Sequence, residues 1–167
     1  MSTGTPPCTI PSPPGARLLC TGVLLLRLLV GSHLYGTAHE GSDFDWYEVH
    51  DHLARRERRQ VIDGDLDVVR FDLSTFMAQA DKGVPQTLEV MFAPADWPEV
   101  DKFKHMRLRW RPDTARAANT YERTIKNFEK LKVTEKRLTH AKRLAYNRDE
   151  LIRTGRFDPT DTTWRLT

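Results

Sequence analysis

The chain has 167 residues, of which 39% are hydrophobic and 29% charged, a composition that suits one folded core and argues against a disordered or membrane-embedded protein. The formal net charge of +3 hides an uneven distribution. Residues 1–100 carry 8 Lys and Arg against 14 Asp and Glu, a net charge of −6, whereas residues 101–167 carry 18 against 9, a net charge of +9. The acidic part suits a metal site and the basic part a polyanion such as a triphosphate or nucleic acid, although a solvated helical surface explains the basic part equally well.

The N-terminal segment gives few functional signals. Residues 1–15 are rich in Pro, Ser, Thr and Gly, which predicts a disordered tail. The two cysteines, Cys8 and Cys20, have no Cys/His group at zinc-ligand spacing beside them, so neither a disulfide framework nor a structural zinc is expected, and we predict a cytoplasmic protein. The apolar run after Arg17 is too short to span a bilayer and is interrupted by Arg27, which argues against a signal peptide or membrane segment.

Three segments of the first hundred residues have the pattern of strands. Residues 23–30 read as the end of a helix that runs into a buried strand, which breaks at a Gly-Ser pair. Residues 43–49 alternate, so that their two aspartates share one face and Trp46 lies on the other, in the core. Residues 66–71 are rich in β-branched and aromatic side chains and predict a third strand. Residues 51–60 are crowded with charge and predict an exposed turn or a short helix.

Helical patterns follow the strands. Apolar side chains at intervals of three and four predict helices at residues 73–80, 114–131 and 134–153. Thr134 is the expected N-cap of the last helix, which ends at a glycine. The predicted fold is α+β: a small mixed β-sheet with helices on one side in residues 16–100, followed by a basic helical, substrate-binding extension in residues 101–167.

Two carboxylates on the second strand suggest a metal site. Asp43 and Asp45 are separated by one residue, so their side chains point the same way from backbone positions roughly 6.6 Å apart. Magnesium prefers a few carboxylate oxygens and completes its shell with water and phosphate, and two such ions about 4 Å apart can activate a hydroxyl and stabilise a departing pyrophosphate. A third carboxylate from a neighbouring strand would complete the site. Asp67 is favoured, with Asp65 and Asp72 as alternatives.

Other residues are suited to holding a nucleotide. Gly31 allows the backbone to approach phosphates closely, and the Ser32 hydroxyl can donate to phosphate oxygens. A polar stripe with spacings of four, three and four lies on the last predicted helix: Lys136, His140, Arg143 and Asn147. This stripe could hold a triphosphate or a base, and an ordinary solvated face remains an equal alternative for any one member. Glu89, in an apolar segment, is expected to pair with an arginine rather than to act in catalysis.

Several segments resemble one known family. Residues 31–38 read Gly-Ser-His-Leu-Tyr-Gly-Thr-Ala, and residues 42–45 read Ser-Asp-Phe-Asp. These segments resemble the signature of predicted nucleotidyltransferases of the DNA polymerase β superfamily, a group common in bacteria and phages and associated in part with RNA repair. The stretch Asp-Val-Val-Arg-Phe-Asp-Leu at residues 67–73 is similar to the family's third-carboxylate strand. Residues 87–94 and 139–144 resemble its later segments, so the resemblance spans roughly residues 24–155.

The resemblance implies an enzyme that transfers a nucleoside monophosphate from a nucleoside triphosphate, ATP or CTP, to a hydroxyl and releases pyrophosphate. The hydroxyl would belong to an RNA end, a protein or a small molecule, so RNA is a candidate partner, and no membrane contact is expected. Two Mg²⁺ ions would be held by Asp43, Asp45 and Asp67. Two alternatives remain open: a catalytically inactive nucleotide- or nucleic-acid-binding module of the same fold, and the antitoxin half of a toxin pair.

Overall fold

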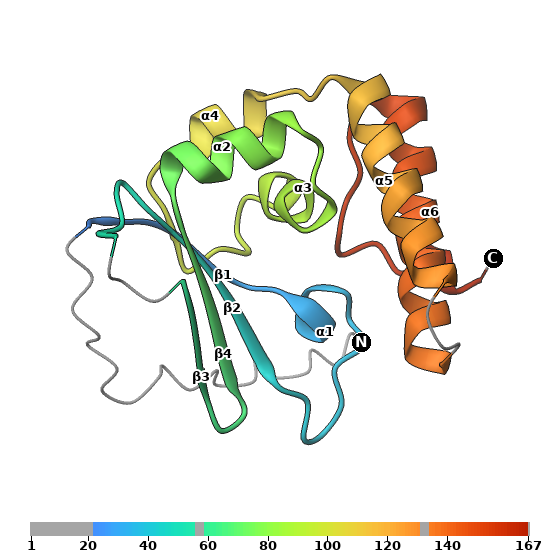
Figure 1. Cartoon of the computed structure of the whole chain (residues 1–167), viewed down its shortest axis with the longest axis horizontal. Helices are drawn as coiled ribbons and strands as arrows, with labels where there is room; N and C mark the ends of the chain where they lie inside the picture. Colours follow the sequence, from blue (N-terminus) through green and yellow to red (C-terminus); the bar gives the residue numbers. More distant parts are fainter. Residues whose placement is uncertain (1–21, 56–58, 131–133, 167) are drawn as a thin grey trace, which may run out of the picture.

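A computed structural model describes residues 22–55, 59–130 and 134–166 of the chain. The expected N-terminal tail and both cysteines lie outside these residues. A five-stranded mixed sheet, in the order β3-β4-β2-β1-β5, forms the centre of the molecule (Figure 1). Its strands are β1 (Leu24–Leu29), β2 (Phe44–His50), β3 (Gln60–Asp63), β4 (Leu66–Asp72) and β5 (Val100–Asp101). Among the described strands, β2 and β4 run parallel and the other pairs are antiparallel.

The helices lie over one face and one side of this sheet. They are α1 (Gly31–Leu34), α2 (Leu73–Asp81), α3 (Pro85–Phe92), α4 (Lys104–Arg109), α5 (Thr114–Glu129) and α6 (Glu135–Thr154), followed by a short 3₁₀ turn, η1 (Thr163–Arg165). Helices α2, α3 and α4 cover the sheet, whereas α5 and α6 run side by side next to it (Figure 1). The α+β fold expected from the sequence, with a C-terminal helical part, is therefore confirmed.

Several elements differ from the sequence-based expectation. The chain preceding β1 is not helical at residues 22–23, whereas residues 51–55 form the exposed turn that was one of the two expected states. The sequence pattern missed β3 and β5, because β3 is an exposed edge strand of four residues and β5 has only two. It also missed α4 and the helical state of residues 85–92, where α3 has nearly every side chain buried and therefore lacks an amphipathic pattern.

One apolar core joins the sheet to the C-terminal helices. Side chains from β1 and β2 pack in it with α2 and α3, and α5 and α6 add Ala117, Tyr121, Leu144 and Leu151. A smaller cluster of Leu29, Trp46 and Val68 lies on the opposite face of the sheet. As predicted, Trp46 is buried there, with the Arg27 guanidinium 4.5 Å from its ring centre. The division into two domains remains a prediction, although both parts contribute to the same core.

The ends of α6 follow the sequence signals. The Thr134 hydroxyl accepts a hydrogen bond from the Arg137 backbone N–H at 3.3 Å, so Thr134 is the N-cap. Gly155 ends the helix with φ +76°, a conformation that favours glycine. These two caps define the start and the end of α6, which runs alongside α5 (Figure 1). Within the described residues, no helix is long and apolar enough to cross a membrane.

Candidate active site

The turn after β1 is pressed against an aspartate of β2. Gly31 has φ +62°, and a Cβ added there would collide with the Asp45 carboxylate. The Val30 N–H donates to the Asp45 carbonyl oxygen at 2.8 Å, which holds the two strands together at this point. The Ser32 carbonyl oxygen accepts hydrogen bonds from the backbone of Thr37 and Ala38 and so orders the loop that follows. Glycine is therefore required at residue 31 by both backbone conformation and space.

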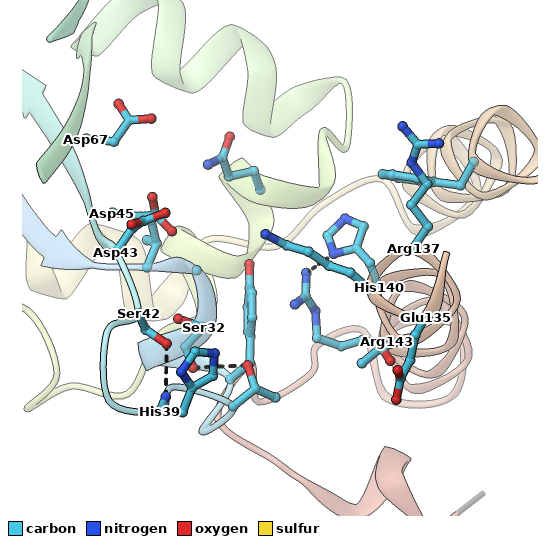
Figure 2. Close-up of a pocket in the computed structure, with 18 of the residues that line it drawn as sticks. Ser32, His39, Ser42, Asp43, Asp45, Asp67, Glu135, Arg137, His140 and Arg143 are labelled. Atoms are coloured by element: carbon cyan, nitrogen blue, oxygen red, sulfur yellow. Dashed lines mark hydrogen bonds between the residues drawn. The ribbon is translucent and has the colours of Figure 1, made fainter. Parts of the chain in front are cut away.

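Two aspartates on adjacent strands and a third just before β2 line one cavity. Asp45 and Asp67 are register partners on the parallel strands β2 and β4, and Asp43 precedes Asp45 by two residues on the same side. Together with Ser32, these three residues, the carboxylate cluster, line a cavity of about 1030 Å³ (Figure 2). Burial raises the pKa of Asp45, and the negative charges of Asp67 and Asp43 raise it further. The three carboxylates are therefore close enough to repel one another, an arrangement that a cation would relieve.

Asp67 has a partner that sequence reasoning did not find. The Gln60 side-chain amide donates to both carboxylate oxygens of Asp67, at 2.9 and 3.1 Å. Gln60 lies on β3, and because the sequence did not predict this strand, it did not predict the contact either. Within the described part of the chain, no three His, Cys, Asp or Glu side chains are placed so as to hold a metal ion. The chemistry of the cluster suits Mg²⁺, but the Asp67 carboxylate is engaged with Gln60 in this structure.

The two alternative aspartates lie elsewhere. Asp65 is exposed in the turn between β3 and β4. Asp72 is the N-cap of α2, where its carboxylate accepts hydrogen bonds from the Thr75 N–H at 2.8 Å and from the Ser74 hydroxyl at 2.6 Å. Neither residue lines the cavity, whereas Asp67 does.

Helix α6 forms the opposite side of the cavity. Its first three turns contribute Glu135, Arg137, His140 and Arg143 to the lining (Figure 2), and Lys136 lines the cavity as well, so this side carries more positive than negative charge. Asn147, the last member of the predicted stripe, is 2% exposed and lies outside the lining. The positive charge of Lys136 opposes the factors that raise the pKa of Asp45, so this lysine lies within electrostatic reach of the carboxylate cluster. An acidic side and a basic side therefore face each other across the cavity.

Arg143 differs from Lys136 because its charge is already balanced. Its guanidinium lies 3.3 Å from the Glu89 carboxylate and 3.2 Å from the centre of the Tyr35 ring. The expected pairing of Glu89 with an arginine is thus confirmed. Both members of the pair are buried, so Arg143 reaches the cavity wall without presenting a free guanidinium.

The C-terminal segment completes the cavity in a way that the sequence did not indicate. Trp164 of η1 lines the cavity, and the Arg165 guanidinium donates to the carbonyl oxygens of Tyr35 and Gly36. The Tyr146 hydroxyl of α6 donates to the Asp161 carboxylate at 2.7 Å and holds the same segment. Tyr35 and Arg165 are 130 residues apart in sequence, and no local pattern predicts such a contact.

The mixed sheet, the Gly-Ser turn beside paired strand carboxylates and the facing basic helix define the class of nucleotidyltransferases related to DNA polymerase β. A family model described as "RlaP: RNA repair pathway DNA polymerase beta family" matches residues 21–164. The chain belongs to this RNA repair pathway DNA polymerase β family, which confirms the resemblance seen in the sequence. A search of curated proteins found no significant match.

Proposed function

We propose that this protein is a Mg²⁺-dependent nucleotidyltransferase that moves a nucleoside monophosphate from a nucleoside triphosphate to a hydroxyl group. The observation that carries the proposal is the position of Asp45 and Asp67 as register partners on parallel strands, in a cavity whose other side is the N-terminal part of α6. This arrangement brings carboxylates suited to a cation, the Gly-Ser turn and positive charge together in one cavity. Family membership supports the same reaction class.

The reaction requires little covalent work from the protein. The acceptor oxygen attacks the α-phosphorus, the bond from that phosphorus to the bridging oxygen of the β-phosphate breaks, and pyrophosphate leaves. The hydroxyl proton passes to a carboxylate of the cluster. Positioning and charge neutralisation therefore account for most of the expected rate enhancement.

Each side of the cavity has its own part in this proposal. Asp43, Asp45 and Asp67 would hold Mg²⁺, which when bound neutralises phosphate charge and favours ionisation of the acceptor hydroxyl. Asp67 would exchange at least one of its hydrogen bonds with Gln60 for this role. The turn at Ser32 would bind phosphate oxygens, and the Lys136 ammonium would balance their charge.

RNA is the proposed acceptor. The family description refers to an RNA repair pathway, and residues 101–167 carry a net charge of +9 that suits a nucleic-acid backbone. The proposed attacking group is a hydroxyl at an RNA end. A protein or small-molecule hydroxyl would give the same pyrophosphate release and is distinguished by the acceptor that becomes labelled.

The test is a transfer assay with the full chain, Mg²⁺, each of the four α-labelled nucleoside triphosphates and short RNAs that differ in their terminal groups. We expect label on an RNA with a free hydroxyl end and an equal amount of pyrophosphate. Labelling should disappear when the chelator EDTA is added. Binding of triphosphate without pyrophosphate release, for every acceptor tried, would instead indicate the inactive nucleotide-binding module.

A further inference from the structure

Glu89 is a buried carboxylate that holds partners rather than facing the cavity. It lies on α3 and is 2% exposed. The Tyr35 hydroxyl donates to its Oε2 at 2.5 Å, and the Arg143 guanidinium lies 3.3 Å from its Oε1. Burial raises the pKa of Glu89, while the charge of Arg143 and the hydrogen bond from Tyr35 oppose that effect. A buried carboxylate with these contacts serves as an anchor for the guanidinium.

Arg143 transmits this anchoring to the cavity. Its side chain is 6% exposed and lies over the Tyr35 ring, so the guanidinium has one fixed position. From that position Nη2 approaches the Nδ1 atom of His140 at 2.9 Å (Figure 2). Arg143 therefore connects Glu89, which lies outside the cavity lining, to His140, which is part of it.

The contact with Arg143 determines where the His140 ring carries its proton. A guanidinium has only donor groups and stays protonated in proteins, so the Nδ1 atom must accept the hydrogen bond with a lone pair. Neutral His140 must then carry its proton on Nε2, which becomes the only donor of the ring. The Phe128 ring packs edge-on against the imidazole at 4.8 Å and restricts its rotation. The result is one tautomer in one orientation.

The surroundings also keep His140 uncharged at neutral pH. Burial lowers the pKa of His140 to about 4, and the positive charges of Arg143 and Lys136, both on α6, contribute to the decrease. Two side chains from other helices belong to the surroundings of the imidazole. Glu89 of α3 is paired with Arg143, which lies between it and the ring, and Phe128 of α5 is uncharged. His140 therefore differs from Lys136, one turn earlier on the helix, which supplies a full positive charge.

We propose that the Glu89–Arg143 pair is a positioning device that makes His140 a neutral Nε2–H donor for the nucleoside part of the bound nucleotide. This inference rests on the proposed function. A neutral donor suits a neutral acceptor atom of a base or sugar, whereas phosphate oxygens are better served by the charge of Lys136. Tyr35, Phe128 and Trp164 also line the cavity, and Phe128 packs against His140, so aromatic side chains suited to a nucleoside belong to the same cavity.

Two substitutions of His140 distinguish the role of Nε2 from that of Nδ1. The amide nitrogen of a glutamine can occupy the place of Nε2, whereas that of an asparagine reaches only the place of Nδ1. We expect His140→Asn to weaken binding of nucleoside triphosphate about tenfold, the value of one hydrogen bond, and His140→Gln to weaken it less than about threefold. Inorganic triphosphate should bind equally to wild type and both variants. Equal effects of the two substitutions, or an equal loss of inorganic triphosphate binding, would overturn the role of His140.

Nitrogen NMR of the ligand-free, ¹⁵N-labelled protein tests the positioning step without any need for activity. We expect the Nε2-protonated tautomer in the wild type. Replacing Arg143 and Glu89 together by glutamine removes both buried charges, so neither is left unpaired. In that variant His140 should populate both tautomers, and its pKa should rise because the charge of Arg143 is gone, while burial still holds it below the ordinary value of about 6.5. Protonation on Nδ1 in the wild type, or an unchanged tautomer in the double variant, would refute the device; the wild-type spectrum decides even if the variant fails to fold.

The two proposals can fail separately. If the wild-type protein binds no nucleoside triphosphate, the proposed function is wrong and His140 has no nucleoside to bind. If the wild type binds and transfers nucleotides but the asparagine and glutamine variants are alike, only the inference about His140 is wrong.

Discussion

The two sides of the cavity are built in different ways. The carboxylate cluster stands on paired strands, where backbone hydrogen bonds set the spacing of Asp45 and Asp67. The basic side belongs to one helix, and its charged residues interact with different partners. The charge of Lys136 acts on the Asp45 carboxylate, whereas the charge of Arg143 is balanced by Glu89. We infer that the strand side is suited to precise placement of reacting atoms and the helix side to binding. The following substitutions test that difference.

Replacing Asp45 by asparagine should have the largest effect. It keeps the shape of the side chain but removes a charge from the centre of the cluster, so the transfer rate should fall by on the order of a thousandfold, equivalent to several kcal/mol of transition-state stabilisation. The measurement is kcat in the RNA labelling assay, with circular dichroism to verify folding. Asp65→Asn is the matched control, because Asp65 is exposed outside the cavity. Undiminished transfer by Asp45→Asn would contradict the division of roles.

Gly31→Ala should disturb the same side without removing a charge. The new Cβ would collide with the Asp45 carboxylate and displace it, and a displacement of about 1 Å can reduce kcat about a hundredfold. Gly64→Ala is the control, since Gly64 has a similar φ of +58° and nothing within 4 Å of an added Cβ. Both substitutions should cost about 1 kcal/mol of stability through backbone strain. Equal activity of the two variants would show that the contact between Gly31 and Asp45 is unimportant.

Lys136→Ala should affect binding more than chemistry. Loss of one ammonium should raise the KM for nucleoside triphosphate by on the order of tenfold, with a smaller change in kcat. The increase should shrink at high salt, because an exposed charge is screened. Lys142→Ala is the control on the same helix, because Lys142 is exposed and does not line the cavity. A fall in kcat with KM unchanged would instead give Lys136 a part in the chemical step.

Asp72→Ala should change stability and leave transfer intact. The hydrogen bond from the Ser74 hydroxyl, followed by that from the Thr75 N–H, lowers the pKa of Asp72 to about 2. Because this value lies below the ordinary one of about 3.9, the stabilisation is complete above pH 4 and is lost as the pH falls toward 2. Urea unfolding at pH 7 should show a loss of about 1 kcal/mol in the variant, and the difference should narrow near pH 2.5. Reduced transfer would revive Asp72 as the third carboxylate.

Local signals in the chain were sufficient to place Asp43, Asp45 and the Gly-Ser turn. The alternation of residues 43–49 places Asp43 and Asp45 on one face, and the Gly-Ser pair marks the end of β1, because both depend on short stretches of backbone geometry. The caps of α6 follow from Thr134 and Gly155 for the same reason. By contrast, the sequence pattern did not predict β3, and so it did not predict the hydrogen bond from Gln60 to Asp67. A short exposed edge strand has too little hydrophobic pattern to be recognised.

The sequence by itself determined the residue types, their faces on each strand and helix, and the family resemblance. Only the tertiary structure decided that Asp67 lies beside Asp45, that Trp164 lines the cavity, and that Glu89 balances the charge of Arg143. The reason is physical: the face of a side chain follows from the local repeat of its backbone, whereas the charge that it presents to a ligand depends on partners brought from distant parts of the chain.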